Sequence, residues 1–413
     1  MQVCRIFRYM ATYLYIDIDA FLASVEQSIN RSLKGRPVMV GGLKNERGIV
    51  YCPSYEARAR GVRVGTSLHE AARLIPDGVF LRGDWFTYQQ FSDRFMAILA
   101  AYGPKINKIS PDEACLDITG LERQFGTPSD LAGRIKKQVR DELALSASVG
   151  IGSSRVLAKI ASEIVKPDNL TVVNPGTERQ FLSPLPVEKI PGIGRVNKRI
   201  LNEMGIGTVG QLQRVPEEYL VTLFGQNGRK FAAYAVGEDG PLIRDYKAVR
   251  SINRETGLAA DITDSGLLIG HYYYLLERAC RRLRALNKKA GRLTIKFRYC
   301  DFEQIEGHAT ITPPSWDEKT FHAQARIMFE VLHRRRKGIR FVGVTLSNLK
   351  NSLNSESFIL DRSEKNERLL GSIDRIRGRF GFLALTTGRT LMLGDCYNRK
   401  VTGYELRTPG LSQ

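Results

Sequence analysis

Hydrophobic and polar positions alternate near the start of this chain, over residues 13–21. A period of two is typical of a half-buried strand, because successive side chains of a strand point to opposite faces. Asp17 and Asp19 then share one face, and Ile16 and Ile18 share the other. The pattern predicts a strand that buries its isoleucines in a core and presents two carboxylates on the other side.

Apolar positions later in the chain follow a helical period or form further strand-like runs. Residues 129–143 predict an amphipathic helix, and residues 366–380 predict a short basic helix with Leu369, Leu370, Ile373 and Ile376 on one face. Between residues 249 and 350 the two kinds of segment alternate, with strands expected at 293–299 and 340–346 and helices at 265–287 and 318–335. A chain of 413 residues with this mixture is expected to be an α+β protein of several domains.

A second acidic pair lies in the segment 110–117, where Asp112 and Glu113 follow a Ser-Pro turn and precede an apolar run. Carboxylates at neighbouring strand ends can hold two Mg²⁺ ions about 4 Å apart, the arrangement used for in-line phosphoryl transfer. Oxygen ligands suit Mg²⁺, which also binds substrate phosphates. A solvated strand end explains either acidic segment equally well when it is taken alone. The metal site is therefore a hypothesis that depends on the two segments together.

The composition points to a polyanionic partner. The formal net charge is +19, which is most simply explained by binding to nucleic acid. A basic protein of the membrane surface is the competing interpretation, but no apolar run approaches the roughly 20 residues that span a bilayer. The six cysteines show no Cys-x-x-Cys spacing, which favours reduced thiols over a zinc site or disulfides. We therefore expect a cytoplasmic protein.

Five sequence blocks resemble the motifs of the Y-family translesion DNA polymerases, and the bacterial DNA polymerase IV-like branch is the most similar. They occur in the family's order and span residues 13 to about 350. The blocks are residues 17–26, 55–62, 110–117, 149–167 and 191–194.

The resemblance implies a right-hand polymerase with a ferredoxin-like palm, small fingers, a helix-hairpin-helix thumb and an α/β little finger. The implied boundaries are 10–20 and 84–173 for the palm, 21–83 for the fingers, 174–240 for the thumb, 241–248 for a linker and 249–350 for the little finger. Residues 351–413 are expected to form a C-terminal tail. Residues 1–9 are expected to be a non-native extension, because the resemblance begins shortly after Met10.

The resemblance also implies the site residues. Two Mg²⁺ ions, with Mn²⁺ able to substitute, are expected to bind the catalytic carboxylates Asp17, Asp112 and Glu113 and the backbone carbonyl of Ile18. The residues expected to contact the incoming nucleotide are Phe21, Leu22, Cys52, Tyr55, Arg58 and Lys159. Those expected to contact the DNA backbone are Gly192, Gly194, Arg195 and Lys198 in the thumb and Arg281, Arg284, Arg334, Arg335 and Arg336 in the little finger.

Two positions depart from the family pattern. Leu22 stands where the family usually has a Tyr or Phe that packs on the incoming sugar and blocks a 2′-hydroxyl. Cys52 replaces a Thr that contacts phosphate through its hydroxyl, and a thiol is the weaker donor. We expect relaxed selection against ribonucleotides, although Tyr51 could narrow the same pocket.

The sequence thus predicts a template-directed, low-fidelity translesion DNA polymerase without proofreading. It is expected to act as a monomer on primer-template DNA with deoxyribonucleoside triphosphates, and also to accept ribonucleoside triphosphates. Two alternatives stay open: a catalytically inactive polymerase-like accessory protein, and a helix-hairpin-helix DNA-binding scaffold that explains the charge but not the carboxylates. Residues 355–360 in the tail resemble a sliding-clamp peptide without its Gln, so only weak clamp binding is expected.

Overall fold

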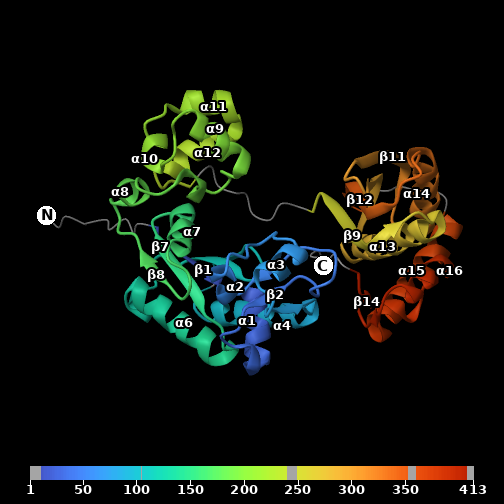
Figure 1. Cartoon of the computed structure of the whole chain (residues 1–413), viewed down its shortest axis with the longest axis horizontal. Coiled ribbons are helices and arrows are strands. Elements are labelled where there is room, and N and C mark those ends of the chain that lie inside the picture. The colour runs from blue at the N-terminus through green and yellow to red at the C-terminus, as the bar shows by residue number, and fades with distance from the viewer. Residues whose placement is uncertain (1–10, 104, 240–248, 352–359, 407–413) are drawn as a thin grey trace. The chain divides into compact units, whose positions relative to one another are not determined.

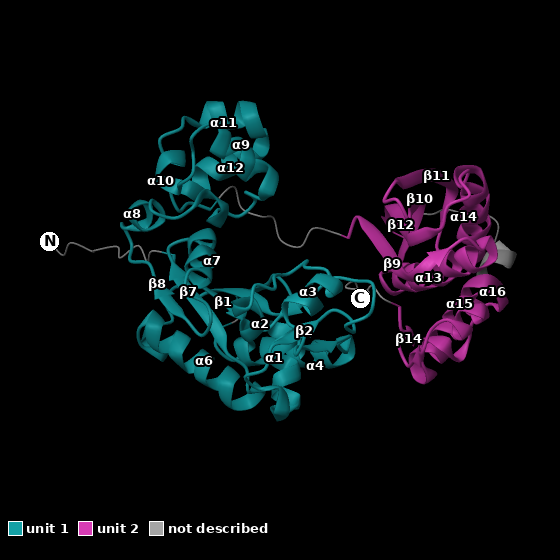
Figure 2. Ribbon diagram, viewed as in Figure 1, with its two compact units in different colours: residues 1–244 teal, residues 245–413 magenta. Residues whose placement is uncertain are grey.

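The computed structural model describes residues 11–103, 105–239, 249–351 and 360–406, the side chains of residues 360–364 excepted. The chain divides into two compact units, Met1–Arg244 and Asp245–Gln413 (Figure 2). The expected N-terminal extension, the linker 241–248 and most of the clamp-like peptide lie outside the described residues. Among the described helices, none is long and apolar enough to cross a membrane.

A five-stranded sheet forms the centre of unit 1, in the order β5-β6-β1-β7-β8 (Figure 1). Strand β1 pairs antiparallel with both of its neighbours, β6 and β7. The strands are β1 (Tyr13–Ile18), β5 (Ile106–Lys108), β6 (Glu113–Asp117), β7 (Ala147–Gly152) and β8 (Leu170–Val172). The helices of this part are α4 (Trp85–Ala100), α5 (Glu122–Phe125), α6 (Pro128–Leu143) and α7 (Arg155–Glu163).

The two faces of this sheet have different neighbours. Leu14 and Ile16 of β1 are fully buried in a core that they share with α4 and α6. Tyr15 points the other way and packs against Ala158 of α7. The alternation predicted from the sequence is confirmed, and Asp17 falls on the face that α7 covers. The amphipathic helix is also confirmed as α6, which Thr127 caps at its N-terminus.

A smaller core lies after β1, in the part of the chain where the fingers are expected. Strand β2 pairs antiparallel with β3 and parallel with β4. Buried Met39, Leu68 and Ile75 hold the helices against this sheet. The buried residues of the first two elements after β1, α1 (Phe21–Ile29) and η1 (Arg31–Leu33), belong to the palm core. The elements that follow are β2 (Val38–Val40), β3 (Cys52–Pro53), α2 (Tyr55–Ala59), α3 (Leu68–Leu74) and β4 (Val79–Leu81).

Short helices form the thumb, around a core that includes Leu201 and Phe231. Leu157 of α7 joins the same core, which ties the thumb to the palm helix. The elements are α8 (Glu178–Leu182), η2 (Val187–Lys189), α9 (Arg195–Glu203), α10 (Val209–Leu212), α11 (Glu217–Phe224) and α12 (Gln226–Ala235). The connection between η2 and α9 is the Pro-Gly-Ile-Gly segment.

Unit 2 is built on a four-stranded antiparallel sheet in the order β11-β10-β12-β9. Two helices pack on one face of this sheet, as the alternation of strand-like and helix-like segments predicted. The elements are β9 (Ser251–Ile262), α13 (Ser265–Ala285), β10 (Lys288–Tyr299), β11 (Gln304–Ser315), α14 (Glu318–Leu332) and β12 (Ile339–Asn351).

The described residues after 360 do not form a separate tail. They fold onto α13, and Phe382, Leu393 and Tyr404 enter the core of unit 2. Their elements are α15 (Leu360–Phe380), η4 (Phe382–Ala384), α16 (Gly388–Leu391), η5 (Met392–Asp395), β13 (Arg399–Lys400) and β14 (Gly403–Tyr404). The expected apolar face of the basic helix is only partly right: Leu370 is buried, whereas Leu369 is 53% exposed. The elements that follow α15 are too short for their apolar residues to show a regular period. An argument from periodicity therefore overlooks the residues that they contribute to the core.

Candidate active site

Asp17, Asp112 and Glu113 lie at neighbouring strand ends, as the two acidic segments predicted. The register of β1 and β6 places Asp17 directly opposite Glu113. The carbonyl of Asp112 accepts a hydrogen bond of 3.0 Å from the backbone N–H of Ile18. Residues almost 100 positions apart in the sequence are thus held at one edge of the palm sheet by backbone hydrogen bonds.

Each of the three carboxylates interacts with one side chain of the protein, through an ion pair or a hydrogen bond. Lys166 Nζ lies 2.7 Å from Asp17 Oδ2. The Ser110 hydroxyl donates to Asp112 Oδ1 at 2.6 Å, and the Tyr15 hydroxyl donates to Glu113 Oε2 at 2.6 Å. As they stand, no three His, Cys, Asp or Glu side chains of the described residues converge closely enough to hold a metal ion. The donor set suits Mg²⁺ in its chemistry, since all three groups offer carboxylate oxygens.

Burial dominates the electrostatics of these carboxylates. It raises the pKa of Asp17 to about 7, although the charge of Lys166 opposes the rise. Burial also raises the pKa of Asp112, against the hydrogen bond from Ser110. Burial acts on Glu113 in the same direction, but the Tyr15 hydrogen bond and the charge of Lys159 bring its pKa below the usual range. Carboxyl groups with pKa values displaced in opposite directions are common at catalytic sites.

Lys159 brings a second ammonium group to this edge of the sheet. It projects from α7, with Nζ 3.1 Å from Glu163 Oε1 and 3.6 Å from Glu113 Oε2. The ammonium also donates to the Tyr15 hydroxyl at 3.0 Å. Its side chain is 29% exposed, so it is reachable from solvent.

Asp19 supports the site and does not face it. Its carboxylate is buried and accepts hydrogen bonds of 2.7 Å from the Ser148 hydroxyl and the backbone N–H of Asp168. The Tyr55 hydroxyl lies 3.5 Å from the same group and links the fingers to the palm. Asp117 accepts from the backbone N–H of Thr119, in keeping with a structural role.

Two of the residues expected to contact the nucleotide have buried side chains. Phe21 is 4% exposed, and its side chain belongs to the palm core. The Cys52 thiol is also buried, which raises its pKa, and the N–H groups of Ala23 and Leu22 lie close to it. Both side chains complete the packing behind the first turn of α1.

The other expected nucleotide contacts remain reachable. Leu22 is partly buried and packs against the palm core. The Arg58 guanidinium lies 4.7 Å from the centre of the Tyr55 ring and donates to the carbonyl of Pro53. Tyr15 and Lys166 were not among the predicted site residues. The alternation that placed Asp17 also places Tyr15 on its face, whereas no sequence spacing reveals a contact between Lys166 and Asp17.

The thumb hairpin exposes the residues expected to meet a DNA backbone. Gly192 has φ +94°, a conformation that favours glycine, and the Phe231 ring lies 3.2 Å from where its Cβ would be. Gly194 has open space in front of it, and Arg195 is exposed at the start of α9. Lys198 is bound to Glu188 at 2.7 Å, which neutralises part of its charge.

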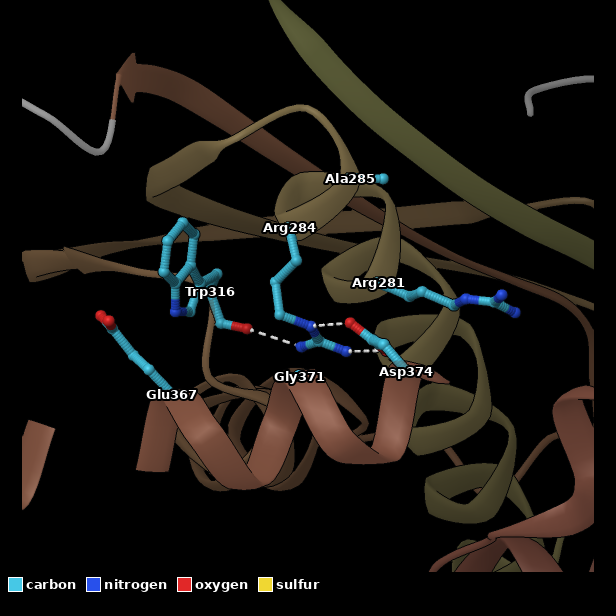
Figure 3. Close-up of a pocket in the computed structure, with 7 residues that line it drawn as sticks. All are labelled: Arg281, Arg284, Ala285, Trp316, Glu367, Gly371 and Asp374. Carbon is cyan, nitrogen blue, oxygen red and sulfur yellow. Dashed lines mark hydrogen bonds and ion pairs between the residues drawn. The ribbon is translucent and has the colours of Figure 1, made fainter. Parts of the chain in front are cut away.

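Arg284 is not available to DNA, contrary to the prediction. Its side chain is 9% exposed and donates to Asp374 at 2.6 Å and to Glu318 at 2.9 Å. Figure 3 shows the guanidinium held between α13 and α15, with a further hydrogen bond to the carbonyl of Trp316. A run of basic residues does not disclose that one of them meets acidic residues far away in the sequence.

The remaining predicted arginines of unit 2 differ in their environment. Arg335 forms ion pairs with Asp301 and Glu303, so little of its charge is free for a phosphate. Arg334 and Arg336 are exposed. Arg281 is partly exposed at the edge of α13.

A basic surface lies on the open face of the unit 2 sheet, and it includes Arg292 from one of the basic runs of the sequence. Side chains alternate along β10, and the face away from the helices carries Arg292, Lys296 and Arg298. Arg340 lies at the start of β12, with its guanidinium over the ring of Phe302. The alternation of polar and apolar residues over 292–298 could have identified this face from the sequence.

Comparison with known proteins agrees with this architecture. The impB/mucB/samB family matches residues 16–163, its C-terminal domain matches residues 249–357, and the IMS family HHH motif matches residues 175–206. DNA polymerase IV of Dehalococcoides mccartyi strain CBDB1 is 34% identical over 386 residues, 93% of this chain and 98% of that protein. DNA polymerase IV 2 of Mesorhizobium japonicum is 35% identical, over 92% of this chain and 94% of that protein.

Solved structures show the same relationship. A Y-family DNA polymerase chimera of Dbh and Dpo4 matches with a TM-score of 0.72 and 26% identity, over 82% of this chain and 99% of that one. An insertion ternary complex of Dbh DNA polymerase matches with a TM-score of 0.57 at the same identity and coverage. The chain therefore belongs to the Y-family DNA polymerases, in the branch that includes the bacterial DNA polymerase IV proteins.

Proposed function

We propose that this Y-family polymerase copies primer-template DNA past damaged bases by two-metal nucleotidyl transfer at Asp17, Asp112 and Glu113. The observation that carries the proposal is the register that places Asp17 opposite Glu113, with Asp112 hydrogen-bonded to Ile18. Two divalent ions bound there would activate the primer 3′-hydroxyl and stabilise the charge of the leaving pyrophosphate. The carbonyl of Ile18, at the same strand end, is the expected backbone ligand.

Two cations beside these carboxylates suit a triphosphate. Lys159 can exchange its contacts with Glu163 and Glu113 for phosphate oxygens, because its side chain is reachable from solvent. Arg58 offers a planar set of donors, and its position over the Tyr55 ring fixes the direction in which they point. Lys159 would supply charge, and Arg58 would also orient the phosphates.

The nucleic-acid contacts are expected to follow the backbone and not the bases. Gly192 and Gly194 let a phosphate approach the thumb hairpin, where Arg195 is exposed. On the open face of the unit 2 sheet, Arg292 and Arg298 add positive charge. Contacts of this kind hold DNA without reading its sequence, as copying requires.

Synthesis is expected to be of low fidelity, without proofreading and with weak sugar selection. Leu22 lies in the first turn of α1, at a position where the family usually has an aromatic residue. Its flexible side chain would be a weak steric barrier to a 2′-hydroxyl. We retain deoxyribonucleoside triphosphates as the main substrates and ribonucleoside triphosphates as accepted ones.

Primer extension with Mg²⁺ tests the proposal. Asp112→Asn should abolish extension while leaving affinity for primer-template DNA unchanged, because the residue lies in the carboxylate site and outside the DNA surfaces. Asp117→Asn, at the far end of strand β6, which begins directly after Asp112, is the matched control and should extend primers at the parent rate. Extension by Asp112→Asn at the parent rate would refute the site. A parent protein that binds DNA but extends no primer would instead support the accessory-protein or scaffold alternative.

A further inference from the structure

The first turn of the palm helix α7 is capped by a residue from the end of the thumb. The Asp239 carboxylate accepts hydrogen bonds from the backbone N–H groups of Arg155 at 3.1 Å and Val156 at 2.9 Å. The next N–H, that of Leu157, donates to the Ser154 hydroxyl at 3.1 Å. A helix leaves the N–H groups of its first turn without partners inside the helix. Asp239 thus supplies two of the acceptors that α7 needs, from 83 and 84 positions further along the chain.

The same contact is an ion pair that is partly shielded from solvent. Arg155 Nε lies 3.0 Å from Asp239 Oδ2, and each of the two side chains is 24% exposed. A carboxylate at this position is also favoured by the positive end of the helix dipole. Beside it, the Ser154 hydroxyl donates to the carbonyl of Gly237 at 2.6 Å in a buried contact. Several hydrogen bonds therefore hold the end of the thumb against the start of α7.

The cap fixes a helix that lies unusually close to the palm sheet. A Cβ on Gly150 of β7 would lie 2.0 Å from the carbonyl oxygen of Ala158, so the backbone of α7 rests directly on this strand. A glycine offers no side chain that could hold the helix at one position along the strand. The cap supplies a fixed point, because it determines where the first turn of α7 begins.

Lys159 lies one turn after the capped residues. Arg155 and Lys159 are four positions apart and therefore lie on the same side of α7. The Lys159 ammonium is 3.6 Å from Glu113 Oε2 and donates to the Tyr15 hydroxyl at 3.0 Å. Asp239 thus holds the helical turn from which Lys159 reaches the carboxylate site.

We propose that Asp239 is a positioning residue for the incoming nucleotide: by capping α7, it holds Lys159 where this ammonium can bind the triphosphate. The inference rests on the nucleotide contact of Lys159 proposed above. If Asp239 acts through Lys159, the loss of Asp239 weakens nucleotide binding only while Lys159 is present. A residue that merely stabilises the fold would have the same effect with and without Lys159.

The test is equilibrium binding of the correct deoxyribonucleoside triphosphate, with Mg²⁺, to the full chain on primer-template DNA. The primer ends in a dideoxynucleotide, so that no bond can form, and a fluorescent base analogue in the template reports binding. We expect the dissociation constant to rise at least about tenfold in Asp239→Ala and in Lys159→Met. Adding Asp239→Ala to Lys159→Met should change it by less than about twofold.

Two further variants complete the design. Asp239→Asn keeps one acceptor oxygen and should raise the dissociation constant by about threefold, again only while Lys159 is present. It carries the test if Asp239→Ala does not fold. The matched control is Thr127→Ala, which removes the cap of another palm helix, α6, and should leave the dissociation constant unchanged.

A dissociation constant that stays at the parent value in both Asp239 variants would overturn the proposal. Equal rises with and without Lys159 would overturn it too, because that is the behaviour of a purely structural residue. Failure of the proposed nucleotide contact has a different signature. In that case Lys159→Met alone would bind the nucleotide as the parent does, and the role of Asp239 would be refuted with it.

Discussion

Arg377 offers a direct test of whether the C-terminal elements are part of the unit 2 fold. Its guanidinium is 3% exposed and donates to Glu277 at 2.8 Å, where Glu277 is fully buried. It also lies 3.4 Å from Glu318 and donates to the carbonyl of Leu385 at 3.0 Å. Arg377→Met keeps the apolar stem of the side chain and removes every one of these contacts.

We expect this substitution to cost about 3–5 kcal/mol at pH 8, because it leaves the Glu277 carboxylate buried with only the Thr387 hydroxyl as a partner. Burial already raises the pKa of Glu277 to about 7, and loss of Arg377 raises it further. A carboxyl with a raised pKa in the folded state gains a proton as the pH falls, so the folded state is favoured at low pH. The cost should therefore be smaller at pH 6 than at pH 8.

Hydrogen exchange of the full chain measures this locally, since a two-unit protein need not unfold in one step. Amides of α15 and α13 should lose protection in Arg377→Met and regain much of it in Glu277→Gln/Arg377→Met, where position 277 no longer carries a buried charge without a cation. Arg379→Met is the control, because Arg379 is exposed on the same helix and its loss should cost less than about 0.5 kcal/mol. If Arg377→Met matches Arg379→Met, or shows the same cost at both pH values, the buried network does not hold the C-terminal elements in place.

Three further predictions follow from the site, the DNA surface and the core of unit 2. Leu22→Phe should sharpen discrimination against ribonucleotides by more than about tenfold in single-nucleotide insertion, equivalent to about 1.4 kcal/mol; a parent that already discriminates as strongly would show that Leu22 is not an open gate. Arg292→Gln should reduce the slope of log DNA affinity against log salt by about 0.9, whereas Arg326→Gln, on α14, should not; equal slopes would remove the open sheet face from the DNA surface. Burial lowers the pKa of His271 to about 4, so unit 2 should lose up to about 3 kcal/mol as the pH falls from 6.5 to 4, and His271→Gln should lack this loss in urea unfolding followed at both pH values.

The sequence could predict each of the two acidic segments because local rules determine them, whereas the resemblance to a known family was needed to bring them together in one site. Alternation along residues 13–18 specifies which side chains share a face, and the Ser-Pro turn before Asp112 begins a neighbouring strand. The amphipathic α6 and the alternating elements of unit 2 were predictable for the same reason. Each of these features depends on spacing within fewer than about 20 residues, where periodicity is informative.

Partnerships between distant residues could not be predicted in this way. Arg284 meets Asp374, 90 positions away, and Lys166 meets Asp17, 149 positions away. A basic residue in a charged run looks the same in the sequence whether it faces solvent or a buried carboxylate. The prediction for Arg284 was wrong because charge alone was considered, and the packing of α15 against α13 decides where that charge lies.

The contrast between Asp17 and Asp19 shows what separates a ligand from a structural carboxylate at the end of one strand. Asp19 accepts hydrogen bonds from neutral donors, the Ser148 hydroxyl and the backbone N–H of Asp168, both of which belong to the fold itself. A cation could take this carboxylate only by leaving those buried donors unsatisfied, at a cost of about 1–3 kcal/mol for each. Asp17 is instead paired with the side chain of Lys166. All hydrogen bonds of the Asp19 carboxylate thus go to groups that belong to the fold, and this difference favours Asp17 over Asp19 as the proposed metal ligand.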